Sequence, residues 1–99
     1  MTITVIAKII AKDGKLDDVI AGLKKIVPKV LESEQGCLEY IPHTVKGRKN
    51  KNTIVFYEKY KDQEAFNVHN TNLAKNMAEI MPLLEPGLDV MQCSSIIEN

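Results

Sequence analysis

The hydrophobic period of this chain switches between two residues and about 3.6, and the order of the switches leaves few folds open. Four runs are strand-like, at 3–11, 37–45, 53–60 and 88–97, and the first of them is rich in Ile, Val and Thr. Two stretches instead show the three-and-four spacing of an amphipathic helix, one from Leu16 and the other from near Gln63. The predicted element order is strand, helix, strand, strand, helix, strand.

This order is typical of the ferredoxin-like split βαβ sandwich, an α+β fold. In it a four-stranded antiparallel sheet carries both helices on one face, and the second and fourth strands form the sheet edges. The 99 residues suffice for one hydrophobic core and are too few for two. We therefore predict a single domain over residues 1–99.

Local signals mark where the two predicted helices begin, bend and end. Pro28 falls inside the first stripe and lacks the backbone N–H, so we expect a kink or a break into two pieces there. Gly36 is placed to end that helix as a C-terminal glycine. Asp62 can cap the second helix, and Pro82 and Pro86 follow its end.

Two predicted strands are apolar on both sides, Ile3–Ile10 and Ile54–Tyr57. A sheet covered on one face only should alternate between apolar and polar residues. On a monomer the uncovered face would expose an apolar patch of roughly several hundred Å², the size that marks an interface. We predict a homodimer in which two sheets pack face to face.

The charge balance excludes broad classes of partner. Thirteen Lys and Arg residues against thirteen Asp and Glu residues give a formal net charge of zero. Such a chain lacks the attraction that nucleic acid or an anionic membrane needs. The one basic run, Lys46–Lys51, contains no aromatic residue on which a base could stack, so we interpret it as a solvated hairpin tip.

The first residues and the cysteines indicate a cytoplasmic protein without a metal cluster. Lys8 and Lys12 interrupt the apolar N-terminal run, which fits neither a signal peptide nor a membrane span. Cys37 and Cys93 fall on opposite edges of the predicted sheet, so we expect both to be reduced. Neither cysteine has the spacing of a zinc or iron–sulfur site.

His69 is the most informative polar residue. It lies three residues after Phe66 and four before Leu73, so it is predicted to face the sheet. Two interpretations stay open. His69 is either a core histidine held by one hydrogen bond or a titratable group on the wall of a pocket between helix and sheet.

Glu58 lies between Tyr57 and Lys59 and faces either the helices or a partner subunit. A carboxylate in either place needs a partner. We favour an ion pair with a lysine or arginine, from the same or the other subunit, over a catalytic role.

Other side chains have two readings each. Tyr40, Tyr57 and Tyr60 are either pocket residues or ordinary strand tyrosines. His43 is interpreted as a surface histidine that could reach a pocket mouth. The methionines at 77, 81 and 91 are either an adaptable pocket lining or core residues.

Three segments in order carry a family resemblance: Glu34–Tyr40 (EQGCLEY), Ile54–Tyr60 (IVFYEKY) and Asp62–Phe66 (DQEAF), followed by His69. With these signatures the chain resembles the antibiotic biosynthesis monooxygenase (ABM) family over nearly its whole length. The resemblance implies a dimeric α+β barrel, in agreement with the apolar strand faces.

The resemblance also implies a chemistry. It indicates a monooxygenase that works on phenolic or quinol-type aromatics without flavin, haem or metal, with O₂ as co-substrate. The substrate, once deprotonated, supplies the electrons. His69 is implied as the catalytic residue that orients or deprotonates the substrate hydroxyl. The implied substrate-binding residues are Tyr40, Tyr57, Phe66, Leu73 and Met77.

Two other functions remain open on the same scaffold. Relatives that resemble this chain isomerise a phosphorylated autoinducer sugar, which would bring Arg48 or the run Lys46–Lys51 to the pocket mouth. A non-catalytic ligand-binding dimer would instead show an apolar pocket and a His69 fully hydrogen-bonded to protein. The chain has no Trp and its first strand no Asn, which argues against the haem-degrading branch.

Overall fold

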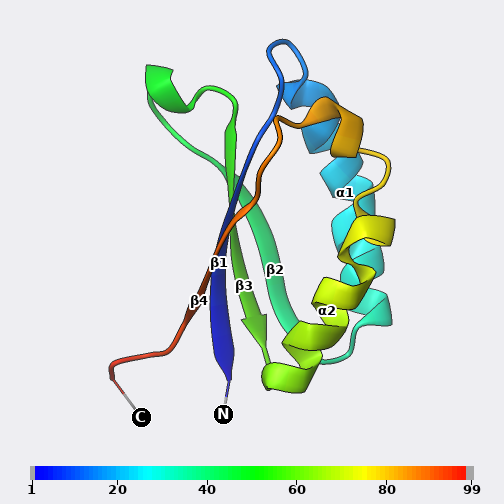
Figure 1. The fold of residues 1–99 in the computed structure, drawn as a ribbon, viewed down its shortest axis with the longest axis vertical. Helices are drawn as coiled ribbons and strands as arrows, with labels where there is room; N and C mark the ends of the chain where they lie inside the picture. The colour runs from blue at the N-terminus through cyan, green and yellow to red at the C-terminus, as the bar shows by residue number, and fades with distance from the viewer. Residues whose placement is uncertain (1, 98–99) are drawn as a thin grey trace.

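The computed structural model describes residues 2–97 and confirms the predicted element order (Figure 1). The strands are β1 (Ile3–Ile10), β2 (Cys37–Thr44), β3 (Thr53–Tyr60) and β4 (Asp89–Cys93). The helices are α1 (Leu16–Ser33) and α2 (Gln63–Asn76), with short 3₁₀ turns at Arg48–Asn50 and Met81–Leu83. The sheet is antiparallel in the order β2-β3-β1-β4, so the predicted α+β ferredoxin-like fold is confirmed. Residues 1, 98 and 99 of the predicted domain lie outside the described part.

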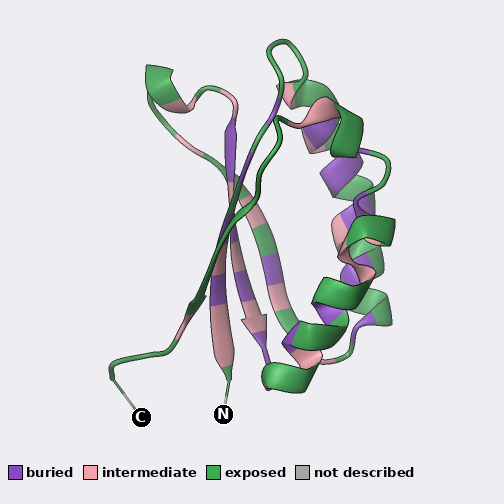
Figure 2. Cartoon of the chain, viewed as in Figure 1, coloured by how far each residue is buried: buried purple, intermediate pink, exposed green. Residues whose placement is uncertain are grey.

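Both helices lie on one face of the sheet (Figure 1). The core forms between them and that face, where Figure 2 shows the buried residues gathered. Side chains in β3 alternate between buried and half-buried positions, as expected for a strand with one covered face. The core residues of α1 that repeat on its inner face are Val19, Leu23, Ile26 and Val30.

Helix α1 runs through Pro28 as one element, so of the predicted kink or break at this residue the break is wrong. Pro28 is exposed, and buried Ile26 and Val30 on either side hold the helix against the sheet. Packing on both sides therefore outweighs the hydrogen bond that proline removes. Within residues 2–97, neither helix combines the length and apolarity that a membrane span requires.

Gly36 does not act as the predicted C-terminal glycine. The helix ends at Ser33 with Glu34 as its C-cap, and Gly36 is not among the glycines with positive φ. A Cβ at Gly36 would collide with the side chain of Ala65 in α2. Glycine at this position thus allows the start of β2 to approach α2 closely.

The strand register lines up the covered face. Glu58 of β3 lies opposite Val5 of β1 on one side and opposite Tyr40 of β2 on the other. Two residues before Glu58 in β3, Phe56 lies opposite Ala7 of β1. These residues point toward the helices, because all five are buried on the face that the helices cover.

The opposite sheet face carries an apolar row across all four strands. In register order the row consists of Ile41, Tyr57, Ile6 and Met91. Ile41 and Met91 are exposed, and Lys8 and Asp89 form an ion pair of 3.4 Å beside the row. The pattern of strands apolar on both sides is therefore confirmed within the subunit.

Strand β4 is shorter than the predicted run 88–97. Its last pair joins Cys93 to Thr4, close to the start of β1, so the following residues have no strand to pair with. Beyond that point the chain leaves the sheet (Figure 1), and Ile96 is 95% exposed. Strand β4 therefore ends where its hydrogen-bonding partner β1 ends, although the alternating sequence continues beyond that point.

Both cysteines are free, as predicted. Cys37 lies at the start of edge strand β2 and Cys93 at the end of edge strand β4. Burial raises the pKa of the Cys37 thiol to about 12, with nearby Glu34 and Glu58 adding to the shift. Cys37 is therefore protonated at neutral pH and packs as a small apolar residue.

Candidate functional site

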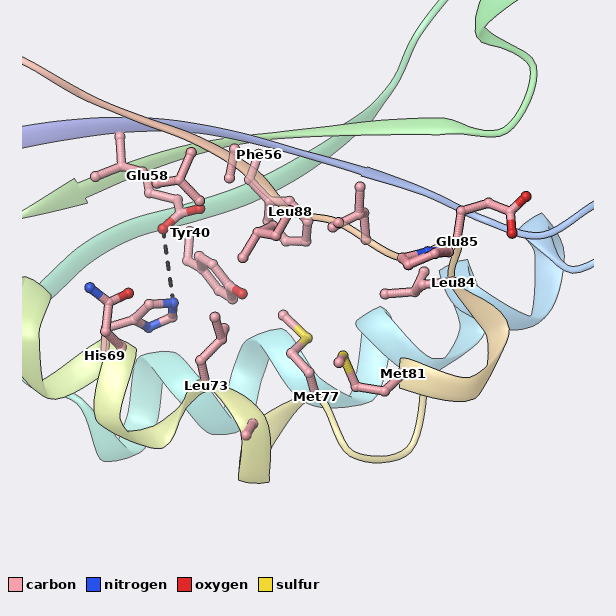
Figure 3. Close-up of a pocket in the computed structure, with 18 of the residues that line it drawn as sticks. Tyr40, Phe56, Glu58, His69, Leu73, Met77, Met81, Leu84, Glu85 and Leu88 are labelled. Carbon is pink, nitrogen blue, oxygen red and sulfur yellow. Dashed lines mark ion pairs between the residues drawn. The ribbon is translucent and has the colours of Figure 1, made fainter.

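A cavity of about 640 Å³ lies between the sheet and α2. It runs from His69 and Glu58 at one end to Leu84 and Glu85 at the other (Figure 3). Its volume falls in the range of small-molecule sites. The apolar residues along its walls include Val5, Ala7, Ile9, Phe56, Phe66, Leu73 and Met77.

The phase of α2 aims His69 into this cavity. The helix begins at its cap Asp62, whose side chain accepts a hydrogen bond of 2.8 Å from the backbone N–H of Ala65. From that start, Phe66 and His69 fall on the inner face and both are buried. His69 is 2% exposed, so the prediction that it faces the sheet is confirmed.

Glu34 holds one nitrogen of the His69 ring. The Nδ1 atom lies 2.8 Å from Oε1 of Glu34, and Oε2 of Glu34 accepts a hydrogen bond of 3.2 Å from the side-chain amide of Asn76. An ionised carboxylate only accepts hydrogen bonds, so this network assigns the hydrogen to Nδ1. In the neutral ring, Nε2 then carries a free lone pair.

The Nε2 atom of His69 points toward Glu58, as the dashed line in Figure 3 marks. Their separation of 3.9 Å is too long for a hydrogen bond. Oε1 of Glu58 accepts a short hydrogen bond of 2.6 Å from the Tyr60 hydroxyl instead. The Nε2 lone pair is therefore free to meet a group entering from the cavity.

Burial raises the pKa of Glu58, although the hydrogen bond from Tyr60 and the charge of His69 act in the opposite direction. Among residues 2–97 of one subunit, Glu58 forms no ion pair with lysine or arginine, so that part of the prediction is wrong, while a cation from the other subunit stays a prediction. Lys59 alternates to the opposite sheet face, and the titratable neighbour of Glu58 on the covered face is His69. Glu58 thus titrates in an unusually apolar setting.

Aromatic rings surround His69. Tyr40 meets it edge-on with ring centroids 5.0 Å apart, and Tyr60 lies tilted at 5.2 Å. Tyr40 also stacks on Phe56 at 5.1 Å. Burial raises the pKa of both tyrosines, so their phenols stay neutral. The hydroxyl of Tyr40 points into the cavity (Figure 3).

The structure brings most of the predicted site residues to one wall. The residues that line the cavity are Tyr40, Phe66, His69, Leu73 and Met77. Tyr57 does not join them, because it alternates to the open sheet face opposite Ile6. The prediction that Tyr57 lies beside the pocket is therefore wrong, and the substrate-binding roles of the others stay predictions.

Three residues at this end were missed in the sequence: Glu34, Tyr60 as a partner of Glu58, and Asn76. A signal for Glu34 was present, since it lies four residues after Val30 and continues the buried stripe of α1. A charged residue at the next position of an apolar stripe indicates a buried partner. Asn76 gave no comparable signal.

The mouth of the cavity differs from expectation. Met81 lines it, as one of the two interpretations had it, together with Leu84, whereas Met91 faces the open side of the sheet. His43 is exposed and borders a separate hollow of about 330 Å³ between α1 and the β2–β3 pair.

The cation at the cavity wall is Lys12, and the lining includes neither Arg48 nor a residue of 46–51. Within residues 2–97, no group of three or more His, Cys, Asp and Glu side chains is placed to hold a metal ion.

The family model described as "Antibiotic biosynthesis monooxygenase" matches residues 2–76. This range contains the whole closed end of the cavity, from Glu34 to Asn76. The comparison with curated proteins found no match.

Solved structures share the fold. A protein from Shewanella oneidensis is 28% identical with a TM-score of 0.74, and the alignment covers 93% of this chain and 88% of that chain. A candidate antibiotic biosynthesis monooxygenase from Caulobacter crescentus is 17% identical with a TM-score of 0.81, over 97% and 91% of the two chains. A Mycobacterium tuberculosis protein is 19% identical with a TM-score of 0.77, over 99% and 98%.

Proposed function

The chain belongs to the antibiotic biosynthesis monooxygenase family, and we propose that it oxidises a small phenolic or quinol-type aromatic with O₂, without flavin, haem or metal. The observation that carries this proposal is the free Nε2 of His69 at the closed end of an apolar cavity. A base in that position can take a proton from a bound hydroxyl.

The cavity suits an aromatic ring with a hydroxyl group. Phe66, Leu73 and Met77 offer an apolar surface, and together with the sheet they keep water from the closed end. The ring would lie along these side chains with its hydroxyl against Nε2 of His69. The neutral hydroxyl of Tyr40 is placed to hydrogen-bond a second oxygen of the substrate.

The proposed reaction balances with O₂ as the only oxidant. His69 takes the hydroxyl proton, and the resulting anion transfers electrons to O₂ as a carbon–oxygen bond forms to give a hydroperoxide. The oxygen–oxygen bond then breaks with loss of the hydrogen on that carbon. One oxygen atom stays in the product as a carbonyl and the other leaves as water, so the substrate supplies all the electrons. Glu34 and Glu58 both stabilise the imidazolium that forms in the first step.

The two alternative functions fit less well. An isomerase of a phosphorylated sugar was expected to bring Arg48 or the loop 46–51 to the pocket, and neither lines the cavity. A non-catalytic binding protein was expected to use both nitrogens of His69 in hydrogen bonds to protein. Only Nδ1 is within that distance.

Oxygen consumption with a panel of quinols and anthrones tests the proposal. We expect uptake with at least one substrate, and His69→Ala should abolish it while the circular dichroism spectrum stays unchanged. The matched control is His43→Ala, which removes the exposed histidine outside the cavity and should keep full activity. Absence of uptake with every substrate would show that the proposed function is wrong.

A homodimer formed through the open sheet face is part of this proposal, since members of the family are commonly dimeric. The row Ile41, Tyr57, Ile6 and Met91 supports it by placing apolar side chains on every strand of that face. Sedimentation at micromolar concentration should give twice the mass of the chain, and a monomer would contradict the proposed dimer. The cytoplasmic location and the lack of nucleic acid or membrane partners stay predictions.

A further inference from the structure

We propose that Glu34 is a positioning residue, which fixes the ring hydrogen of His69 on Nδ1 and so keeps Nε2 as the base that faces the cavity. The catalytic consequence of this inference rests on the proposed function. The tautomer assignment does not, because it concerns the protein without substrate.

Glu34 acts through His69 and not on a ligand. It is 6% exposed and is not among the residues that line the cavity. Its Oε1 lies 2.8 Å from Nδ1, the ring nitrogen that points away from the cavity. The only reacting group that Glu34 can influence directly is therefore the imidazole.

The Glu34 carboxylate is held from two directions. Its backbone N–H donates to the carbonyl of Val30, and its own carbonyl accepts from the N–H of Cys37, both at 2.9 Å. On the side chain, Asn76 donates to Oε2 at 3.2 Å. Asn76 and His69 belong to the same helix, so α2 contacts both oxygens of the carboxylate at the C-cap of α1. This geometry orients the ring before a substrate arrives.

The groups that face His69 come from every element around it. Glu34 follows α1, Tyr40 lies on β2, and Glu58 and Tyr60 lie on β3. The two tyrosines are neutral, so the charged neighbours are both carboxylates. Of these, Glu34 is the one within hydrogen-bond distance of the ring, at 2.8 Å against 3.9 Å for Glu58.

Replacing the Glu34 carboxylate by an amide tests its effect on the His69 ring while the packing of the side chain is kept. Glutamine has the shape of glutamate and can donate through its amide, which a carboxylate cannot. In Glu34→Gln the amide can donate to Nδ1, and the ring hydrogen then moves to Nε2. The fold should survive, while the base at Nε2 is lost.

The experiment combines nitrogen NMR of ¹⁵N-histidine-labelled protein with steady-state oxygen uptake. The chain has two histidines, so His43→Ala assigns the signals. We expect the Nδ1–H tautomer in the wild type and the Nε2–H tautomer in Glu34→Gln. We also expect kcat to fall by about 10²- to 10⁴-fold with little change in KM, as when a triad carboxylate becomes an amide. Glu32→Gln, an exposed glutamate in the last turn of α1, is the matched control and should change neither readout.

Retention of the wild-type tautomer and kcat in Glu34→Gln would overturn the positioning role, and so would an Nε2–H tautomer in the wild type. If Glu34→Gln does not fold, Glu34→Asp decides. It keeps a carboxylate but shortens the side chain by one methylene and draws the oxygen back from Nδ1, so it should raise the Nε2–H population and lower kcat, and wild-type values would overturn the inference. A wild type with the Nδ1–H tautomer but no oxygen uptake would contradict the proposed function alone.

Discussion

The two ends of the cavity are built on different principles. At the closed end His69, Glu34 and Glu58 are each at most 6% exposed, and Nδ1 of His69, both carboxylate oxygens of Glu34 and Oε1 of Glu58 take part in hydrogen bonds. At the mouth, Met81 is 55% and Leu88 46% exposed, and the lining is largely apolar. One end fixes polar atoms in place, and the other offers a surface that can adapt.

This difference suits the closed end to the chemical step and the mouth to substrate recognition. A base must be held in the geometry of proton transfer, which buried and mutually bonded groups achieve. A flexible apolar mouth can accept substrates that share a hydroxylated ring and differ elsewhere. Substitutions at the closed end should therefore change stability and kcat, whereas those at the mouth should change KM.

A large effect that tests this division is expected from Tyr60→Phe, which removes a hydrogen bond at the closed end. The substitution removes the donor that lies 2.6 Å from Oε1 of Glu58 and leaves a buried carboxyl with the more distant His69. We expect a loss of about 1–3 kcal/mol in the free energy of unfolding, measured by urea denaturation. Tyr57→Phe on the open face is the control and should cost less than about 0.5 kcal/mol. Equal costs for the two variants would show that the closed end is not the more tightly bonded region.

A smaller effect should appear in the pH dependence of stability. Burial raises the pKa of Glu58 above its ordinary value of 4.5. The contribution of Glu58 to stability is then fully present below about pH 4.5 and is lost as the pH rises through the folded-state pKa. The slope that one such group can cause is at most about 1.4 kcal/mol per pH unit.

Glu58→Gln removes this titration. The free energy of unfolding of Glu58→Gln, relative to the wild type, should increase as the pH rises above 4.5. Urea denaturation at a series of pH values measures the difference, with the exposed Glu64→Gln as a control that should stay parallel to the wild type. A constant difference between Glu58→Gln and the wild type would contradict the raised pKa.

Hydrophobic period was sufficient to predict the fold. The alternation of the strands and the stripe of α2 depend on local spacing, which the sequence contains directly. The same spacing correctly directed His69 to the sheet. The end of an element depended instead on residues far away in the sequence. Strand β4 ends because β1 offers no further partner. Position 36 needs a glycine because a side chain there would collide with Ala65 of α2.

The candidate site was predictable only in part for the same reason. Tyr57 and Glu58 are adjacent in sequence, and which of them faces the helices depends on the side of the sheet that the helices cover. The pairing of Glu34 with His69 joins residues 35 positions apart. That contact arises where the residue that follows α1 meets α2, and periodicity within either helix does not determine it.

The smallest effect on stability is expected from substitution of Met81. Met77 lines the same cavity, so Met77→Ala is the matched comparison. Met77 is 7% exposed and Met81 55%, so Met77→Ala should cost about 2 kcal/mol or more and Met81→Ala less than about 0.5 kcal/mol in urea denaturation. In oxygen uptake with a bulky quinol, Met81→Ala should raise KM by about 2- to 5-fold through lost apolar contact and leave kcat unchanged. A fall in kcat with constant KM would place Met81 in the chemical step, and the division between a fixed closed end and an adaptable mouth would then fail.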